Sequence, residues 1–168
     1  MNEQASSWHV RVAVREDQTA ICRFWWALME EQMASDPELW LACDARERWC
    51  RGFVTDVRSS IHAFYVAEDA AGSVVGFAHA YLMYPPPLYA QELEAFLAEI
   101  YVEPSWRGKG VGHALVEQIR QWALSKQAKR VRLEVLARNE KALHFWNREG
   151  FRPFSILAIQ PLSGNRKD

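Results

Sequence analysis

Residues Val102–Gly112, with the sequence VEPSWRGKGVG, join a predicted strand to a predicted helix through glycines at three alternate positions. Glycine lets the backbone adopt positive φ and approach a ligand closely, as Gly108 and Gly110 could do here. The first amides of a helix have no intrahelical partners and carry the positive end of the helix dipole. With the charges of Arg107 and Lys109, these features predict a cradle for a pyrophosphate. The glycines alone would equally fit a tight strand–helix turn bearing basic surface residues.

The spacing of the glycines excludes two other phosphate-binding loops. The dinucleotide fingerprint G-x-G-x-x-G needs a third glycine where this sequence has His113 or Leu115. The Walker loop ends in Gly-Lys-Ser/Thr, whereas here Gly-Lys comes first and Gly110 follows it. The pattern that remains is R-x-x-G-x-G, from Arg107 to Gly112, directly after a strand.

Hydrophobic periodicity predicts the other elements of the chain. A turn is expected at residues 69–73, a loop at Pro85–Pro87, and a helix cap at Asn139. The expected strands are Trp8–Val14, Ala63–Glu68, Val74–Met83, Phe96–Val102, Val131–Leu136 and Phe151–Leu162. The expected helices are Glu16–Met33, Asp36–Val57 (in one piece or in two around Gly52), Gly110–Lys126 and Asn139–Gly150.

Composition favours one globular domain. The chain has 168 residues, of which 49% are apolar and 24% charged, so we expect a single domain over residues 1–168 with a flexible segment at 1–7. No apolar run approaches the ~18–20 residues that span a bilayer, and the polar N-terminus lacks a signal peptide. We therefore expect a cytoplasmic protein with no membrane partner. The three cysteines show no metal-like spacing, and Cys43 and Cys50 are expected to be packed, reduced thiols.

The formal net charge of -1 hides an asymmetry along the chain. Residues 16–47 hold 8 acids and 2 bases, a net of -6, whereas residues 105–152 hold 11 bases and 4 acids, a net of +7. The small total argues against a nucleic-acid partner. The split suits either ordinary solvated helix faces or a site with one anionic and one cationic partner.

The glycine pattern resembles motif A of the GNAT superfamily of N-acetyltransferases. Upstream, residues 100–104 (IYVEP) are similar to the end of that family's fourth strand. Downstream, the pattern from Asn139 through Ala142, Phe145 and Trp146 to Gly150-Phe151 is similar to its motif B. The resemblance is strong from about Leu97 to Phe151. It implies an α/β fold with a mixed, mostly antiparallel sheet, splayed fourth and fifth strands, and four flanking helices.

The resemblance implies acetyl-coenzyme A as the cosubstrate and no resident metal. Backbone amides of the glycine loop would hold the pyrophosphate, and the fourth strand would pair with the pantetheine arm. Trp146 stands where the family usually has a tyrosine that can protonate the leaving thiolate, and indole has no acidic hydroxyl. The coenzyme-contacting residues implied are Ile100, Val102, Arg107, Gly108, Lys109, Gly110, Val111, Gly112, Asn139 and Trp146.

The implied reaction is direct attack of a primary amine of a small molecule or peptide on the thioester. Glu99 is our first candidate for the base, with Glu94 and Glu103 as weaker alternatives; Glu99 could instead be a substrate-binding anion or a half-exposed strand residue. Tyr101 is the candidate acid, although the thiolate could also leave without one.

The acceptor is the least determined part of the prediction. We expect Glu30, Tyr84 and Tyr89 to contact a cationic amine, such as a polyamine, an amino-sugar, a lysine-like amine or a protein amine. The alternative function is a coenzyme A-binding module that senses or scaffolds without turnover, to which Trp146 gives some weight. The resemblance also implies that homodimers could form, through the exposed final strand.

Overall fold

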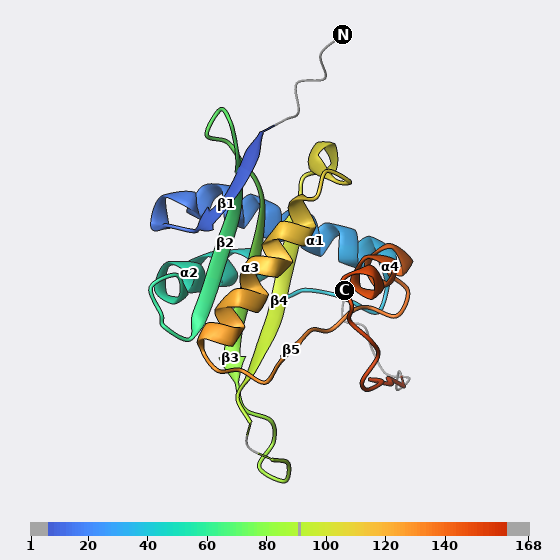
Figure 1. Ribbon diagram of the computed structural model, residues 1–168. Helices are drawn as coiled ribbons and strands as arrows, with labels where there is room; N and C mark the ends of the chain where they lie inside the picture. Colours follow the sequence, from blue (N-terminus) through green and yellow to red (C-terminus); the bar gives the residue numbers. More distant parts are fainter. Residues whose placement is uncertain (1–6, 91, 161–168) are drawn as a thin grey trace.

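The computed structural model describes residues 7–90 and 92–160 of the chain. Its centre is a five-stranded sheet in the order β1-β2-β3-β4-β5 (Figure 1). Strands β1 to β4 pair with one another in the antiparallel direction, and β5 pairs with β4 in the parallel direction. The mixed, mostly antiparallel sheet is therefore confirmed. The strands are β1 (Trp8–Val12), β2 (His62–Asp69), β3 (Val74–Met83), β4 (Glu94–Val102) and β5 (Arg130–Arg132).

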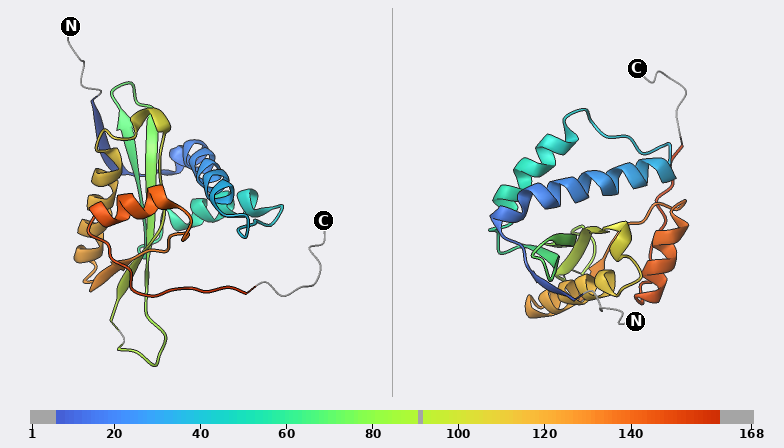
Figure 2. Two further views of the ribbon diagram at one scale, coloured as in Figure 1. Left: turned by 90° about the vertical axis from the view of Figure 1, so that its right-hand side faces the viewer. Right: turned by 90° about the horizontal axis from the view of Figure 1, so that it is seen from above.

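Helices cover both faces of the sheet (Figure 2). Two of them, α1 and α2, lie on one side, and α3 and α4 lie on the other. Two short 3-10 turns, η1 (Arg15–Asp17) and η2 (Pro104–Trp106), precede α1 and α3. In the described part of the chain the α-helices number four, as expected: α1 (Gln18–Ser35), α2 (Ala45–Asp56), α3 (Val111–Ser125) and α4 (Glu140–Arg148).

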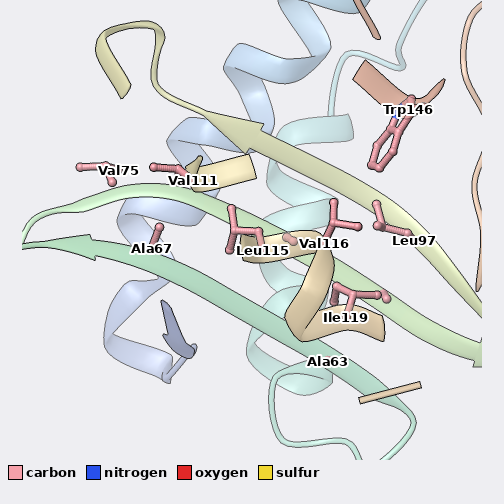
Figure 3. Close-up of a cluster of buried hydrophobic side chains, with 11 residues drawn as sticks. Ala63, Ala67, Val75, Leu97, Val111, Leu115, Val116, Ile119 and Trp146 are labelled. Carbon is pink, nitrogen blue, oxygen red and sulfur yellow. The ribbon is translucent and has the colours of Figure 1, made fainter. Parts of the chain in front are cut away.

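The sheet is buried on both faces, so the protein has two apolar clusters. Successive strand residues point to opposite faces, and Phe77 accordingly joins the α1–α2 side while Ala78 joins the α3 side. The α3-side cluster includes Leu97, Leu115 and Trp146 (Figure 3). The opposite cluster is rich in aromatic rings, among them Phe24, Trp25, Phe53, Phe64, Phe77 and Tyr101.

The ladder between β4 and β5 is short. It pairs only Glu94–Phe96 with Arg130–Arg132. Beyond it, the edge of β4 from Leu97 to Val102 has no strand partner on the β5 side within the described residues. This confirms the expected separation of the fourth and fifth strands and leaves backbone groups of β4 available to an extended ligand.

The expected helix over Asp36–Val57 is wrong in its first part. The structure has turns over residues 36–44, and α2 begins only at Ala45. Asp36 is the C-cap of α1 rather than the N-cap of a following helix, and its carboxylate accepts a hydrogen bond from the amide of Glu38 at 2.9 Å. Such a local side-chain bond offers the backbone an alternative to the helix. The helix α2 is continuous through Gly52.

Two expected strands are shorter than predicted or missing. The strand over Val131–Leu136 extends only from Arg130 to Arg132, and no strand forms over residues 151–160. The rest of the predicted Phe151–Leu162 strand, and residues 1–6 of the expected flexible segment, lie outside the described residues. The segment after α4 leads away from the sheet (Figure 2). It therefore forms no strand within the described residues, and β5 stays at the edge of the sheet without a strand on its outer side. Four of its apolar side chains are exposed: Phe154, Ile156, Leu157 and Ile159.

The cysteines also differ from expectation. A disulfide joins Cys22 of α1 to Cys50 of α2, with the two Cα atoms 5.6 Å apart, and Cys43 is exposed and free. The expectation that Cys43 and Cys50 are packed, reduced thiols is therefore wrong, because Cys43 is exposed and Cys50 is disulfide-bonded. The unwound segment before Ala45 takes Cys43 off the helical face that a continuous helix would have given it.

Candidate active site

The glycine loop has the backbone geometry of an anion cradle. Gly110 is the N-cap of α3 with φ of 84°, and Gly108 has φ of 76°. The first intrahelical bond that reaches back to this cap comes from the amide of Ala114, at 3.0 Å from the carbonyl of Gly110. The amides of residues 111–113 therefore precede the regular helical ladder at the positive end of the dipole. A negatively charged diphosphate fits this arrangement.

The third glycine of the motif has a different role. A Cβ atom on Gly112 would lie 3.3 Å from the ring of Phe145 and 3.9 Å from Cγ2 of Val102. The start of α3 thus packs closely between α4 and the end of β4. Behind it, Trp146 is buried and contributes to the α3-side cluster (Figure 3).

The motif B asparagine acts as the cap of α4. The side-chain oxygen of Asn139 accepts a hydrogen bond from the amide of Ala142 at 3.1 Å. The predicted helix start is therefore confirmed. The contact of Asn139 with a coenzyme stays a prediction.

The basic residues of the loop are tied to the protein's own groups. Arg107 donates from Nε to the carbonyl of Val102 at 2.8 Å and from its terminal nitrogen to Glu31 at 2.6 Å. The ammonium of Lys109 lies 5.0 Å from the ring centre of Trp106. Arg107 consequently links the glycine loop to α1. An arriving anion would meet a charge already shared with Glu31.

Glu99 lies on the α2 side of β4, opposite its neighbour Ile100, which packs on the α3-side cluster. Its side chain is only 14% exposed. One carboxylate oxygen accepts from Nε1 of Trp49 at 3.1 Å, and the other accepts from Nδ1 of His79 at 2.6 Å. The β3–β4 register shifts beside His79, and such bulges re-aim side chains. The carboxylate is therefore held by two donors from different elements.

The other candidate carboxylates are structural. Glu94 is fully buried and binds Arg130 and Arg132, at 2.6 Å and 3.2 Å. Glu103 pairs with Arg23 at 3.0 Å at the end of β4. Neither carboxylate is held by the Trp49–His79 pair of donors that holds Glu99, and the choice of Glu99 as the base stays a prediction.

Tyr101 lies on the same face of β4 as Glu99, two residues further on. Its ring packs on Phe24 at 5.5 Å, and the guanidinium of Arg107 lies 5.2 Å from its ring centre. Burial raises the pKa of the Tyr101 phenol, with a further increase from Glu31 that Arg107 opposes. The phenol thus keeps its proton at neutral pH, as a proton donor requires. Its role as the acid stays a prediction.

The structure places the predicted acceptor residue Tyr84 away from Glu99. Met83 pairs with Glu94 at the end of the β3–β4 ladder, and Tyr84 follows it, whereas Glu99 pairs with His79. At ~3.3 Å per residue, this separates Tyr84 from Glu99 by roughly 16 Å along the strands. Tyr89 is exposed further along the same loop, and Glu30 on α1 accepts a hydrogen bond from Nε1 of Trp26.

The residues that do surround Glu99 were missed by sequence reasoning. Trp49 of α2 stacks on Trp25 at 5.1 Å and so presents its N–H to Glu99. His79 is the cross-strand partner of Glu99, and His62 lies 3.0 Å beyond His79. The spacing of these side chains along the sequence carries no sign of their meeting. Only the strand pairing, read residue by residue, could have predicted the His79–Glu99 contact.

Two further features are absent from residues 7–90 and 92–160. No group of three or more His, Cys, Asp or Glu side chains is placed to hold a metal ion. No helix is long and apolar enough to cross a membrane.

Comparison with known proteins identifies the class of this chain. The model of the acetyltransferase (GNAT) family matches residues 25–151, which is about three quarters of the sequence. The chain belongs to this family and is an N-acetyltransferase by class.

Some curated relatives match nearly the whole chain, and others match only part of it. YwnH of Bacillus subtilis, named as an acetyltransferase, is 23% identical over 160 residues, covering 95% of this chain and 93% of that protein. Streptothricin acetyltransferase of Escherichia coli is 40% identical over 57 residues, or 34% of this chain and 33% of that protein. Thialysine N-epsilon-acetyltransferase of Sus scrofa is 37% identical over 57 residues, or 34% of each.

Solved structures show the same fold at low sequence identity. The BH1408 protein of Bacillus halodurans, solved as a tetramutant, superposes with a TM-score of 0.80 at 20% identity, covering 92% of this chain and 99% of that one. The aminoglycoside N-acetyltransferase AAC(6')-Iy, solved in complex with CoA, has a TM-score of 0.72 at 16% identity, covering 98% and 100%. The predicted family and fold are confirmed.

Proposed function

We propose that this protein transfers the acetyl group of acetyl-coenzyme A directly to a primary amine, with Glu99 as the base. The observation that carries the proposal is the position of Glu99 on β4. This partly buried carboxylate, held by Trp49 and His79, lies on the strand whose unpaired edge leads from Leu97 to the glycine loop. The same strand therefore carries the proposed base and the unpaired backbone edge, and it leads directly into the glycine loop.

The residues present fit acetyl-coenzyme A. The start of α3 suits the diphosphate, and the edge of β4 from Leu97 to Val102 offers backbone groups to an extended amide-bearing arm. When bound, the coenzyme would supply an acetyl thioester. The task of the chain is then to hold the two substrates together, accept a proton and stabilise developing charge.

Glu99 is suited to accept a proton from the attacking amine. Its two oxygens accept one hydrogen bond each from the protein, and a carboxylate oxygen has two lone pairs. A lone pair therefore remains for the ammonium of the acceptor. The indole rings of Trp25 and Trp49, stacked beside this carboxylate, would stabilise a cation partly removed from water.

The surroundings of Glu99 indicate the class of acceptor. A single carboxylate beside aromatic rings favours a compact primary ammonium group on a small molecule or a peptide side chain. The named substrates of the partial relatives, streptothricin and thialysine, both belong in a first panel. The panel should add spermidine, glucosamine, phosphinothricin and a peptide with a free N-terminus.

The test is release of free coenzyme A thiol from acetyl-coenzyme A in the presence of each amine. Amine-dependent release, with the acetylated product detected by mass spectrometry, would support the proposal. Tight coenzyme binding without thiol release on any amine would instead favour a sensor or scaffold function.

A matched pair of glycine variants tests the cradle. Gly110→Ala places a side chain in a backbone with φ of 84°, and Gly72→Ala imposes the same strain, with φ of 81°, in the β2–β3 turn. Each should cost about 1–2 kcal/mol of stability. Only Gly110→Ala should weaken coenzyme binding, and Gly110→Val should abolish it while the fold survives. Unchanged affinity in both Gly110 variants would remove the diphosphate assignment.

A further inference from the structure

Four titratable side chains form a row that leads from Glu99 to the surface. Glu99 contacts His79 at 2.6 Å, His79 contacts Nδ1 of His62 through its Nε2 at 3.0 Å, and Nε2 of His62 lies 4.0 Å from Asp56 at the end of α2. The exposed fractions of the side chains of His79, His62 and Asp56 are 8%, 18% and 38%. The side chain of Glu99 is itself 14% exposed, so the row runs from Glu99 through the buried His79 to a solvated end at Asp56.

The fold fixes the row by strand pairing and ring stacking. Phe64, His79 and Glu99 are successive cross-strand partners on β2, β3 and β4. The ring of His79 stacks on Phe64 at 3.9 Å, and the two histidine rings are nearly parallel, with an interplanar angle of 9°. These contacts hold the nitrogens in line and oppose rotation of the buried ring.

Hydrogen-bond chemistry allows two protonation states of this row with the same geometry. A carboxylate only accepts, so Nδ1 of His79 carries a proton toward Glu99 in both states. When His79 is doubly protonated, its Nε2–H donates to Nδ1 of His62, which then carries its own proton on Nε2. When His79 is neutral, the Nδ1–H of His62 donates instead. The two states differ by one proton, and neither ring has to turn.

The surroundings of His62 favour passing a proton on rather than keeping it. Burial lowers the pKa of His62, Asp56 opposes this effect, His79 lowers the pKa further, and Glu99 raises it. The remaining titratable neighbour is Tyr81, whose ring lies 5.7 Å from that of His62. Burial and the nearby Glu99 and Glu134 raise the pKa of Tyr81, with Arg132 opposing, so the phenol stays neutral at physiological pH.

We propose that His79 and His62 are positioning residues for Glu99 and that they exchange a proton with the surface at Asp56 when Glu99 is protonated. The inference rests on the proposed function of Glu99 as the base. Glu99 accepts the proton of the substrate ammonium; the Nε2 proton of His79 moves to Nδ1 of His62, and the Nε2 proton of His62 moves to Asp56 or solvent. One proton enters the row and one leaves it. To restore the row, Glu99 passes its proton to the departing coenzyme thiolate or to solvent, and one proton returns from the surface through His62 to Nε2 of His79.

The physical reason for the coupling is charge. A doubly protonated His79 is stabilised by the carboxylate of Glu99, and this attraction disappears once Glu99 becomes neutral. Loss of the histidine proton then avoids an unpaired buried cation. The transfer keeps the net charge of the buried row constant, so that the amine proton does not add charge to an apolar interior.

The test uses His62→Gln and His79→Gln, with His9→Gln as the control at an exposed histidine on β1. Glutamine keeps a polar side chain but cannot accept and release a proton at neutral pH. With the panel amine that gives the highest rate, kcat should fall by about tenfold or more in both variants. The acidic limb of the pH–rate profile should shift, and the KM for acetyl-coenzyme A should change little. Addition of imidazole should partly restore activity to His62→Gly.

A second measurement needs no acceptor. In the free protein, the ring ¹⁵N signals of His62 and His79 should change together with pH, as expected for coupled sites. Glu99→Gln should move the titration of His62 to lower pH, because the carboxylate raises the pKa of His62. His9 serves as the internal reference.

The outcomes separate this inference from the proposed function. If Glu99→Gln loses activity while both histidine variants keep the wild-type rate and pH profile, the row has no role and Glu99 remains the base. If Glu99→Gln is fully active, Glu99 is not the base, and that part of the proposed function is wrong. Independent titration of the two histidines, unaffected by Glu99→Gln, would also overturn the inference.

Discussion

Replacing Glu99 by glutamine removes the proposed base while keeping the shape of the side chain. In the native site both carboxylate oxygens accept, from Trp49 at 3.1 Å and from His79 at 2.6 Å. Glutamine has one oxygen and one NH₂ group, so only one donor keeps its acceptor. The indole N–H cannot change its role, whereas His79 can move its proton to Nε2 and accept from the amide. We therefore expect the amide oxygen to face Trp49.

The magnitudes for stability and activity should differ strongly. A buried donor left without a partner costs about 1–3 kcal/mol, and the tautomer change of His79 makes the lower figure the better expectation. Loss of a general base lowers the rate by about 10²–10⁴-fold, which corresponds to roughly 3–5 kcal/mol in the barrier. Glu99→Gln should thus remain folded and bind coenzyme with nearly unchanged affinity, yet lose most of its turnover.

The assay is thiol release across pH, with coenzyme affinity and thermal unfolding measured in parallel. Glu103→Gln is the matched control, because this carboxylate ends the same strand and pairs with a largely exposed Arg23. Such a pair contributes at most about 1 kcal/mol, so the control should keep its activity. A Glu99→Gln enzyme whose acidic limb coincides with that of the wild type would refute the assignment of Glu99 as the base.

Three further expectations concern stability. A Cβ atom at Gly76 would lie 2.8 Å from the carbonyl oxygen of Tyr101, so Gly76→Ala should destabilise the protein by about 1–3 kcal/mol in denaturant unfolding; a neutral result would mean that β3 and β4 can separate freely. Reduction of Cys22–Cys50, which closes a loop with a sequence separation of 28, should lower stability by about 3–4 kcal/mol, and an unchanged melting temperature with dithiothreitol would contradict it. The lowered pKa of His62 means that the unfolded chain binds more protons just below pH 6.5, so stability should fall as pH decreases through this range; His62→Gln should reduce that slope, and an equal slope in both proteins would be the contrary outcome.

The local pattern of the sequence was sufficient for most elements of the fold. The strand–glycine–helix segment around Gly110, the turn at residues 69–73 and the cap at Asn139 depend on neighbours within a few residues. The strand predictions that were wrong concern segments whose structure depends on distant parts of the chain. The strand over residues 131–136 and the last strand depend on partners from other parts of the chain, and periodicity carries no information on whether those partners arrive.

The charge asymmetry of the sequence was real, but its interpretation changed with the structure. Many acids of the negative segment pair with arginines, as Asp17 does with Arg11 and Glu31 does with Arg107. The acidic half of the chain is therefore largely neutralised by ion pairs. The proposed cationic acceptor rests on one partly buried carboxylate, Glu99, rather than on the sum of the charges.

By itself, the sequence determined the family and the strand–glycine–helix motif, and it predicted Glu99 as the base. These features depend on residue type and short spacing, which are local. Only the tertiary structure determined that Trp49, His79 and His62 meet at Glu99, and that Tyr84 and Tyr89 lie away from it. The reason is physical: a cross-strand contact depends on the register of the sheet and on the bulge beside His79, and both are fixed by the packing of the whole domain.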